Sequence, residues 1–224
     1  MYWYTIPDSS FGNQYVSSVN GPPNPRSASS YGAMVRGLRQ LNDQGETKKP
    51  IWMFVEILSG SPGEEFVRYI DPDELKGAVM SSIINEARGI VWFNNVASET
   101  HSVGNVLREA QVKGVSFVGY EQVVAMGEIN NLVHGLAPVI NTQSYEWNFG
   151  SGLDTMLKAH NGYAYIFAMT DDGSTGSRTL VLPDGISGDT AEVIGENRTI
   201  TINNGTLTDN FQNEYTYHIY KIRL

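Results

Sequence analysis

Cysteine is absent from this chain of 224 residues. Its absence excludes disulfide bonds, thiolate catalysis and metal sites built on cysteine. Basic residues are also few, with 15 Lys and Arg against 24 Asp and Glu, which gives a formal net charge of −9. Because nucleic acids and anionic membranes repel a surface of that charge, we expect neither as a partner.

Long apolar runs are missing as well. No run approaches the roughly 20 residues that a membrane-spanning helix needs, and the residues after Met1 lack the basic and apolar regions of a signal peptide. The histidines lie far apart without ligand spacing, so we expect no metal ion and no cofactor. The composition, rich in Gly, Asn, Ser, Thr and Tyr with few Lys, favours a protein that works outside the cell or on a virus particle.

The most informative segment is Lys49–Glu56, KPIWMFVE, an apolar run that stops on a carboxylate. A second run, Gly89–Asn95, also predicts a buried strand. Between them, residues 71–74 (DPDE) carry the cap, the proline and the acidic residue of a helix start. Strand, helix and strand together predict a parallel βα unit, and α/β barrels keep their chemistry where Glu56 lies, at the carboxyl end of a strand.

Helical spacing recurs elsewhere in the first part of the chain. It predicts helices over Tyr31–Leu41, Asn105–Val112 and Tyr120–Leu136, the last of them ended by Pro138. The aromatic and β-branched run Met1–Ile6 predicts a further strand.

The pattern changes near Asn141, where short alternating runs separated by turn residues begin. This punctuation is typical of an antiparallel sandwich, so we expect a domain boundary near residue 140. The predicted strands are Leu153–Ala159, Tyr163–Met169, Arg178–Leu182, Ala191–Ile194, Thr199–Ile202 and Tyr215–Ile222.

This order of elements resembles the C-terminal half of a retaining glycoside hydrolase with a TIM barrel, in which a small β-sandwich follows the last barrel strands. The resemblance implies an α/β plus all-β fold: residues 1–140 as the C-terminal part of a (β/α)8 barrel, and residues 141–224 as a sandwich. Related barrels also occur in tail-associated proteins of bacteriophages.

The resemblance also implies roles for particular residues. Glu56 matches the nucleophile at the end of the seventh barrel strand, and Trp92 matches an aromatic of the eighth strand that lines the sugar site. Tyr2 and Tyr4 lie on the matching sixth strand, from which a tyrosine often hydrogen-bonds the nucleophile. Asn94 follows the eighth strand and could offer its amide to sugar hydroxyls.

Each of these residues also has a purely structural interpretation. Glu56 could be a solvated strand end or a salt-bridge partner, Trp92 and one of the tyrosines could pack in the core, and Asn94 could serve a turn. The sequence alone leaves these alternatives open.

The sequence departs from the family at the second carboxylate. Retaining hydrolysis needs two carboxyl groups roughly 5 Å apart, and the family's acid/base Glu ends the fourth strand, upstream of the part that this chain matches. The pair Asn85-Glu86 lies within the predicted helix and is not that acid. We therefore expect the rest of the barrel in a longer chain or in another chain. The competing hypotheses are a non-catalytic carbohydrate-binding or structural module, as in a phage tail, and glycan binding by the sandwich alone.

Overall fold

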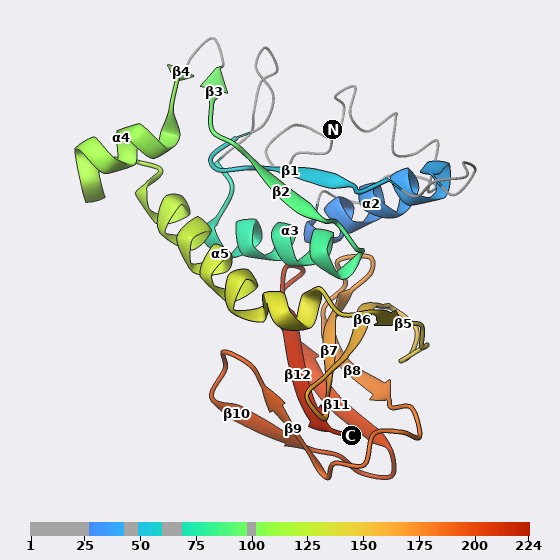
Figure 1. Ribbon diagram of the computed structural model, residues 1–224. Coiled ribbons are helices and arrows are strands. Elements are labelled where there is room, and N and C mark those ends of the chain that lie inside the picture. Colours follow the sequence, from blue (N-terminus) through green and yellow to red (C-terminus); the bar gives the residue numbers. More distant parts are fainter. Residues whose placement is uncertain (1–26, 43–48, 60–68, 98–101) are drawn as a thin grey trace. The chain divides into compact units, whose positions relative to one another are not determined.

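The computed structural model describes residues 27–42, 49–59, 69–97 and 102–224. The chain divides into two compact units, Met1–Asn131 and Leu132–Leu224 (Figure 1). The division lies inside helix α5 (Tyr120–Ile140), the last helix before the β-rich part of the chain. The boundary expected from the sequence, near residue 140, corresponds to the end of that helix.

A parallel βα unit forms the centre of the N-terminal unit. Strand β1 (Trp52–Glu56) pairs in parallel with strand β2 (Gly89–Phe93), and helix α3 (Pro72–Ile84) connects them (Figure 1). The unit predicted from the sequence is therefore confirmed. Parallel pairing requires such a crossover, which here brings the carboxyl ends of both strands to the same edge.

Helix α3 owes its ends to local chemistry. At its start the backbone N–H of Asp71 donates to the Glu74 carboxylate at 2.9 Å, which is one half of the predicted capping box. At its end Asn85 is the cap, and Glu86 follows with φ of 70°, in the left-handed region. The Asn85-Glu86 pair, expected inside the helix, thus forms its end. It has a structural role there and does not lie at a strand end.

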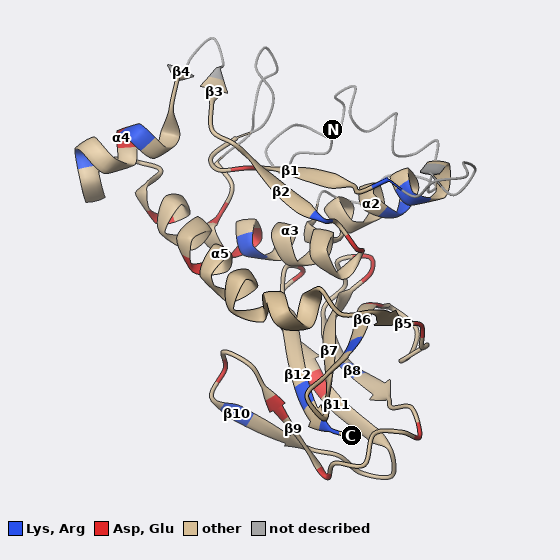
Figure 2. Cartoon of the chain, viewed as in Figure 1, with Lys and Arg blue, Asp and Glu red and all other residues tan. Residues whose placement is uncertain are grey.

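Helix α2 (Ala28–Asn42) packs against this end of α3. Arg36 donates to Oδ1 of Asn85 at 2.8 Å, and Arg39 donates to the carbonyl oxygen of Glu86 at 2.7 Å. Figure 2 shows α2 with stretches of its ribbon in the blue of Lys and Arg. Two guanidinium groups therefore meet the C-terminal end of α3, where the helix dipole favours positive charge.

The rest of the N-terminal unit follows β2. It comprises a short antiparallel hairpin, a helix, one 3₁₀ turn and the long helix α5. In order these are β3 (Val96–Ala97), β4 (Ser102–Val103), α4 (Val106–Lys113), η1 (Gly114–Ser116) and α5. Pro138 lies inside α5, so the prediction that it ends the helix is wrong. Proline removes one hydrogen bond, and this close to the end of a helix the last turn continues past it.

Among the described helices, α5 is long and apolar enough to cross a membrane, judged by length and composition alone. It buries Gln122, Ala125 and Ile129 and exposes Glu121 and Glu128. Of the apolar window that meets the membrane criterion, 22% is buried, and Val124 on the same helix is exposed.

The C-terminal unit contains antiparallel strands in two sheets, with strand orders β10-β9-β12-β7-β6-β5 and β11-β8. The strands are β5 (Ser144–Tyr145), β6 (Leu153–His160), β7 (Tyr163–Thr170), β8 (Gly176–Val181), β9 (Thr190–Val193), β10 (Arg198–Thr201), β11 (Thr206–Phe211) and β12 (Tyr217–Arg223). The six strands predicted here from alternation all form. Sequence reasoning missed β5 and β11, because β5 is very short and β11, TLTDNF, is mostly polar.

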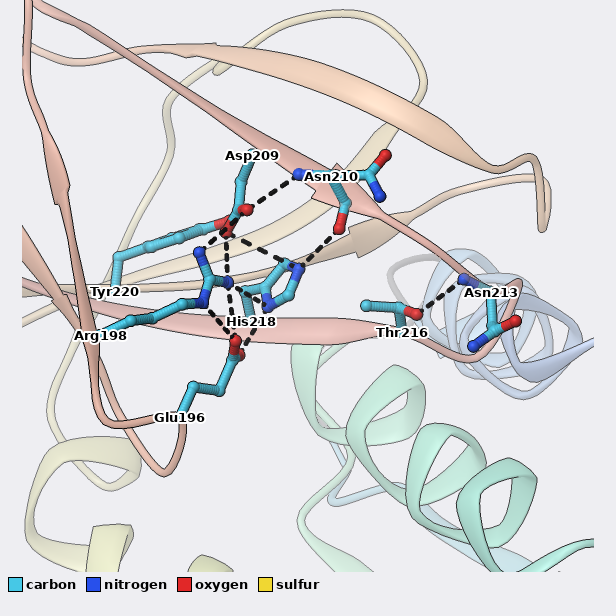
Figure 3. A network of polar contacts seen from close by, with 8 residues as sticks. All are labelled: Glu196, Arg198, Asp209, Asn210, Asn213, Thr216, His218 and Tyr220. Carbon is cyan, nitrogen blue, oxygen red and sulfur yellow. Dashed lines mark hydrogen bonds and ion pairs between the residues drawn. The ribbon is translucent and has the colours of Figure 1, made fainter.

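A network of charged and polar side chains joins the two sheets (Figure 3). Arg198 of β10 donates two hydrogen bonds to Asp209 of β11, at 3.0 and 2.7 Å, and Tyr220 of β12 donates to the same carboxylate at 3.0 Å. Nδ1 of His218 lies 2.6 Å from Oε1 of Glu196, and Arg198 donates to Oε2 of Glu196 at 2.7 Å. Asp209 thus ties β11 of the small sheet to the large one, and the carbonyl oxygen of its neighbour Asn210, 3.2 Å from Nε2 of His218, adds a second contact.

The network shifts the protonation of its members. Burial alone would raise the pKa of the Asp209 carboxyl, but the hydrogen bonds from Arg198 and the nearby positive charge outweigh it, so its pKa lies below the usual range. Burial and the Asp209 charge raise the pKa of Tyr220, so its hydroxyl stays protonated and donates.

We expect Gly32→Ala to destabilise the N-terminal unit by about 1–3 kcal/mol, the usual cost of overpacking. A Cβ at Gly32 of α2 would lie 2.2 Å from Nδ2 of Asn85 and 2.6 Å from Oγ of Ser81, both on the facing helix end. The matched control is Gly127→Ala in α5, where a Cβ meets nothing within 4 Å. That change should be neutral or stabilising by up to about 1 kcal/mol. Urea unfolding of both variants measures the difference, and equal stabilities would contradict this packing.

We expect Asp209→Asn to destabilise the C-terminal unit by about 2 kcal/mol, because a hydrogen-bonded charge is lost from a site that is largely buried. Asp184→Asn, at an exposed turn position, is the control. A carboxyl whose pKa is lowered on folding contributes its full stabilisation at pH values above its ordinary pKa of 3.8. That stabilisation is lost as the pH falls through the lowered pKa of the folded state. The gap in unfolding free energy between wild type and Asp209→Asn should therefore close below about pH 4. A gap that is constant down to acid pH would show that the charge of Asp209 is not what stabilises the unit.

Candidate functional site

Glu56 is the last residue of β1 and lies at the carboxyl end of the parallel pair. It is in register with Phe93 of β2, and the backbone N–H of the next residue, Ile57, donates to the carbonyl oxygen of Phe93 at 3.2 Å. The Glu56 side chain is fully buried. A buried carboxylate is unfavourable unless polar groups meet it.

Tyr31 meets that carboxylate. Its hydroxyl donates a hydrogen bond to Oε2 of Glu56, and the Tyr31 side chain is itself buried. Tyr31 lies in the first turns of α2, where Ala28 and Val35 share its buried stripe. Helix α2 is thus coupled both to the end of β1 and, through its arginines, to the end of α3.

Sequence reasoning missed the role of Tyr31. The helical spacing indicates only that Tyr31 begins an amphipathic helix. One signal was available: a tyrosine at an apolar helical position buries a hydroxyl that needs a partner. The spacing of the sequence does not show which partner that is.

Trp92 lies on the face of the sheet opposite to Glu56. Residues paired in register point to the same face, so Val55 and Trp92 share one face while Glu56 and Phe93 share the other. Trp92 packs against a buried apolar cluster that includes Ile57. The structure therefore places Trp92 and the Glu56 carboxylate on opposite faces of the strand pair, and a role for Trp92 at a sugar stays a prediction. Phe93 is the aromatic that pairs in register with Glu56.

The amide of Asn94 is engaged by the helix that follows. Its oxygen accepts from the backbone N–H of Leu107 at 3.0 Å, and its nitrogen donates to Oδ1 of Asn105 at 3.1 Å. Asn105 in turn caps α4 by accepting from the N–H of Arg108 at 2.9 Å. This geometry favours the turn interpretation of Asn94 over contact with a sugar.

Tyr2 and Tyr4 lie outside the described residues, so their roles stay predictions. Within the described ranges no group of three or more His, Cys, Asp and Glu is placed to hold a metal ion.

The face of the sheet that carries Glu56 is apolar and open. Trp52 and Phe54 alternate with the buried residues of β1 and are 62% and 38% exposed. Trp52 lies over Gly89, where a Cβ would come within 2.8 Å of its ring. An exposed Trp and Phe side by side on one strand face mark a surface that another element covers.

Among the strands that the structure describes, β1 and β2 pair only with each other. A parallel pair with unpaired edges is rarely stable by itself, because its free backbone groups pair readily with other strands. Within the described residues, the exposed face and the edges without a partner strand are features of a sheet that further strands would extend.

No protein-family model and no curated protein matches this sequence. Solved structures of glycoside hydrolases do match it in fold. An α-amylase from Anoxybacillus is 11% identical with a TM-score of 0.55, and the match covers 96% of this chain and 46% of that one. Amy13B from Eubacterium rectale is 10% identical with a TM-score of 0.51, over 98% of this chain and 47% of that one. A third, AmyP in complex with maltotriose, has a TM-score of 0.51 at 10% identity, over 67% and 35% of the two chains.

These similarities show a glycoside-hydrolase-like partial fold. The chain spans about half the length, or less, of the solved structures that it matches. At this level of identity the likeness concerns the fold alone; the matched structures are glycosidases built on TIM barrels.

We expect Tyr31→Phe to destabilise the N-terminal unit by about 1.5–3 kcal/mol, since the change removes a donor from a buried carboxylate and leaves the packing intact. Tyr120→Phe is the matched control, because Tyr120 presents its ring to the apolar cluster of the same unit. In a Glu56→Gln background the cost of Tyr31→Phe should fall, and the difference measures their coupling. Urea unfolding gives all four free energies. Independent effects of the two changes would show that the hydroxyl does not stabilise the carboxylate.

Proposed function

We propose that this chain contributes the nucleophile of a retaining glycoside hydrolase, with Glu56 as the attacking carboxylate. The observation that carries the proposal is the position of Glu56, which ends a parallel strand on the open face of a barrel-like βα unit. Barrel enzymes place their catalytic groups at this end of their strands. The fold shared with glycoside hydrolases supports a saccharide as the substrate.

The remaining barrel strands form the proposed partner. They would pair with the open edges of the β1-β2 sheet and cover Trp52 and Phe54, because the interior of a closed barrel is filled with side chains. The acid/base carboxyl belongs to that partner, whether it lies in the same longer chain or in another. On this account residues 1–140 correspond to the last barrel units and the antiparallel C-terminal unit to the sandwich that follows them.

The mechanism assigns one task to each group near Glu56. The carboxylate attacks the anomeric carbon and forms a glycosyl-enzyme ester, while the acid of the other barrel half protonates the departing oxygen; water then hydrolyses the ester. Tyr31 orients Glu56 through its hydrogen bond. Because Glu56 is buried in the chain alone, its surroundings must open toward the substrate when the barrel is complete.

Trapping of the intermediate tests this proposal. Fluorosugar glycosides with an activated leaving group need no proton donor for the first step, so the nucleophile alone becomes labelled. We expect such probes, in gluco and xylo configuration, to add one glycosyl group to the chain in its native assembly and peptide mapping to locate it on Glu56. Glu56→Gln should remove the label, and Glu121→Gln, at an exposed position of α5, should retain it.

A label on another residue would contradict Glu56 as the nucleophile. No label in the native assembly would leave the chain as a non-catalytic carbohydrate-binding or structural module. The location outside the cell or on a virus particle, expected from the composition, stays a prediction.

A further inference from the structure

A hollow of about 400 Å³ opens on the surface of the C-terminal unit, far along the chain from Glu56. Ala159 and Ala164, which pair across β6 and β7, are among the residues that line it. Its larger apolar lining residues are Tyr145, Trp147, Leu157, Pro183, Ile186 and Leu224. The volume lies within the range of small-molecule sites, roughly 300–1,000 Å³.

Two half-exposed aromatic rings line this hollow. Tyr145 is 50% exposed and Trp147 is 44% exposed. Aromatic rings usually bury most of their surface, and two such rings at one apolar hollow form a surface suited to a partner with a flat apolar face.

A hydrogen bond made outside the hollow anchors the ring of Trp147, and other hydrogen bonds hold the strand that carries Tyr145. The indole N–H of Trp147 donates to the carbonyl oxygen of Val181 at 2.8 Å, which ties the ring to β8. Tyr145 lies on β5, and β5 is tied to β6 by the buried Lys158, whose ammonium donates to Oγ of Ser144 at 2.6 Å and to the carbonyl oxygen of Thr142 at 3.0 Å. Rings held in advance lose little conformational entropy when they bind.

A polar group stands among these apolar side chains. Glu146 lies between the two aromatic residues in sequence, lines the hollow and is exposed. A carboxylate accepts hydrogen bonds from paired hydroxyls, whereas the apolar rings pack against C–H groups. The hollow therefore complements a ligand with a C–H face and hydroxyl edges.

We propose that this hollow binds a saccharide chain, with Trp147 and Tyr145 packed against pyranose faces and Glu146 accepting from hydroxyl groups. The choice of a saccharide among amphipathic ligands rests on the proposed function. The site itself is separate from Glu56, and it would hold a polysaccharide on the enzyme without taking part in bond cleavage.

Affinity electrophoresis of the full chain tests this inference, with soluble starch, xylan or mixed-linkage β-glucan cast into the gel. We expect at least one polysaccharide to retard the wild-type protein. Trp147→Ala and Tyr145→Ala should each weaken the apparent Kd at least tenfold. Trp147→Phe, which keeps a ring but loses the N–H, should fall between them and wild type. Tyr163→Ala is the control, because Tyr163 is an aromatic of β7 that is 38% exposed and outside the hollow.

Two results would overturn the inference: no retardation of the wild type in any of the three gels, or retardation of the Trp147 and Tyr145 alanine variants equal to that of wild type. If Trp147→Ala does not fold, Tyr145→Ala decides alone.

The same gels separate this inference from the proposed function. If only Glu56→Gln abolishes retardation, the saccharide binds at the carboxylate and the hollow has no part in it. If retardation depends on Trp147 but fluorosugars do not label the protein, the inference about the hollow stands and the proposed catalysis is contradicted.

Discussion

The parallel pairing of β1 with β2 is the constraint on which the N-terminal unit depends. It fixes the register that pairs Glu56 with Phe93, and so decides which side chains share the face of the carboxylate. The crossover through α3 makes this pairing possible, and the end of α3 in turn anchors α2 through Arg36 and Arg39. Because α2 also supplies Tyr31, one chain of contacts leads from the strand pair back to the carboxylate.

The sequence was informative where local chemistry decides structure. The DPDE start of α3 and the apolar runs on either side each depend on a few neighbouring residues, and together they predicted the βα unit correctly. The alternation of apolar and polar residues predicted six of the C-terminal strands for the same reason. It failed for β11, whose pairing with β8 comes from tertiary context and not from apolar alternation.

The candidate site was harder to predict, because it depends on faces and on distant partners. Trp92 lies one residue before Phe93, and a single step along a strand moves a side chain to the other face of the sheet. The family resemblance predicted the strand that carries Trp92 but not the face of the sheet on which its side chain lies. Tyr31 is 25 positions away from Glu56 in sequence, and no spacing rule connects a helix start to the end of a later strand.

The two units suggest a division of tasks within one chain. The N-terminal unit holds a buried carboxylate, Glu56, at the end of β1. The proposal assigns to it one of the two carboxyl roles that retaining hydrolysis needs. The C-terminal unit carries an internally braced antiparallel fold, joined across its sheets through Asp209, and an aromatic hollow on its surface. An enzyme of polysaccharides uses both functions, one to hold the polymer and one to cleave it.

The most direct test of the account asks whether further strands cover the open face of the β1-β2 sheet. Hydroxyl-radical footprinting with mass spectrometry compares the isolated recombinant chain with the same chain in its native assembly. The account predicts strong labelling of Trp52 and Phe54 in the isolated chain, where they are 62% and 38% exposed, and clear protection of both in the native assembly. Equal labelling of the two residues in both samples would contradict it, because the sheet would then remain open and no barrel would form around Glu56.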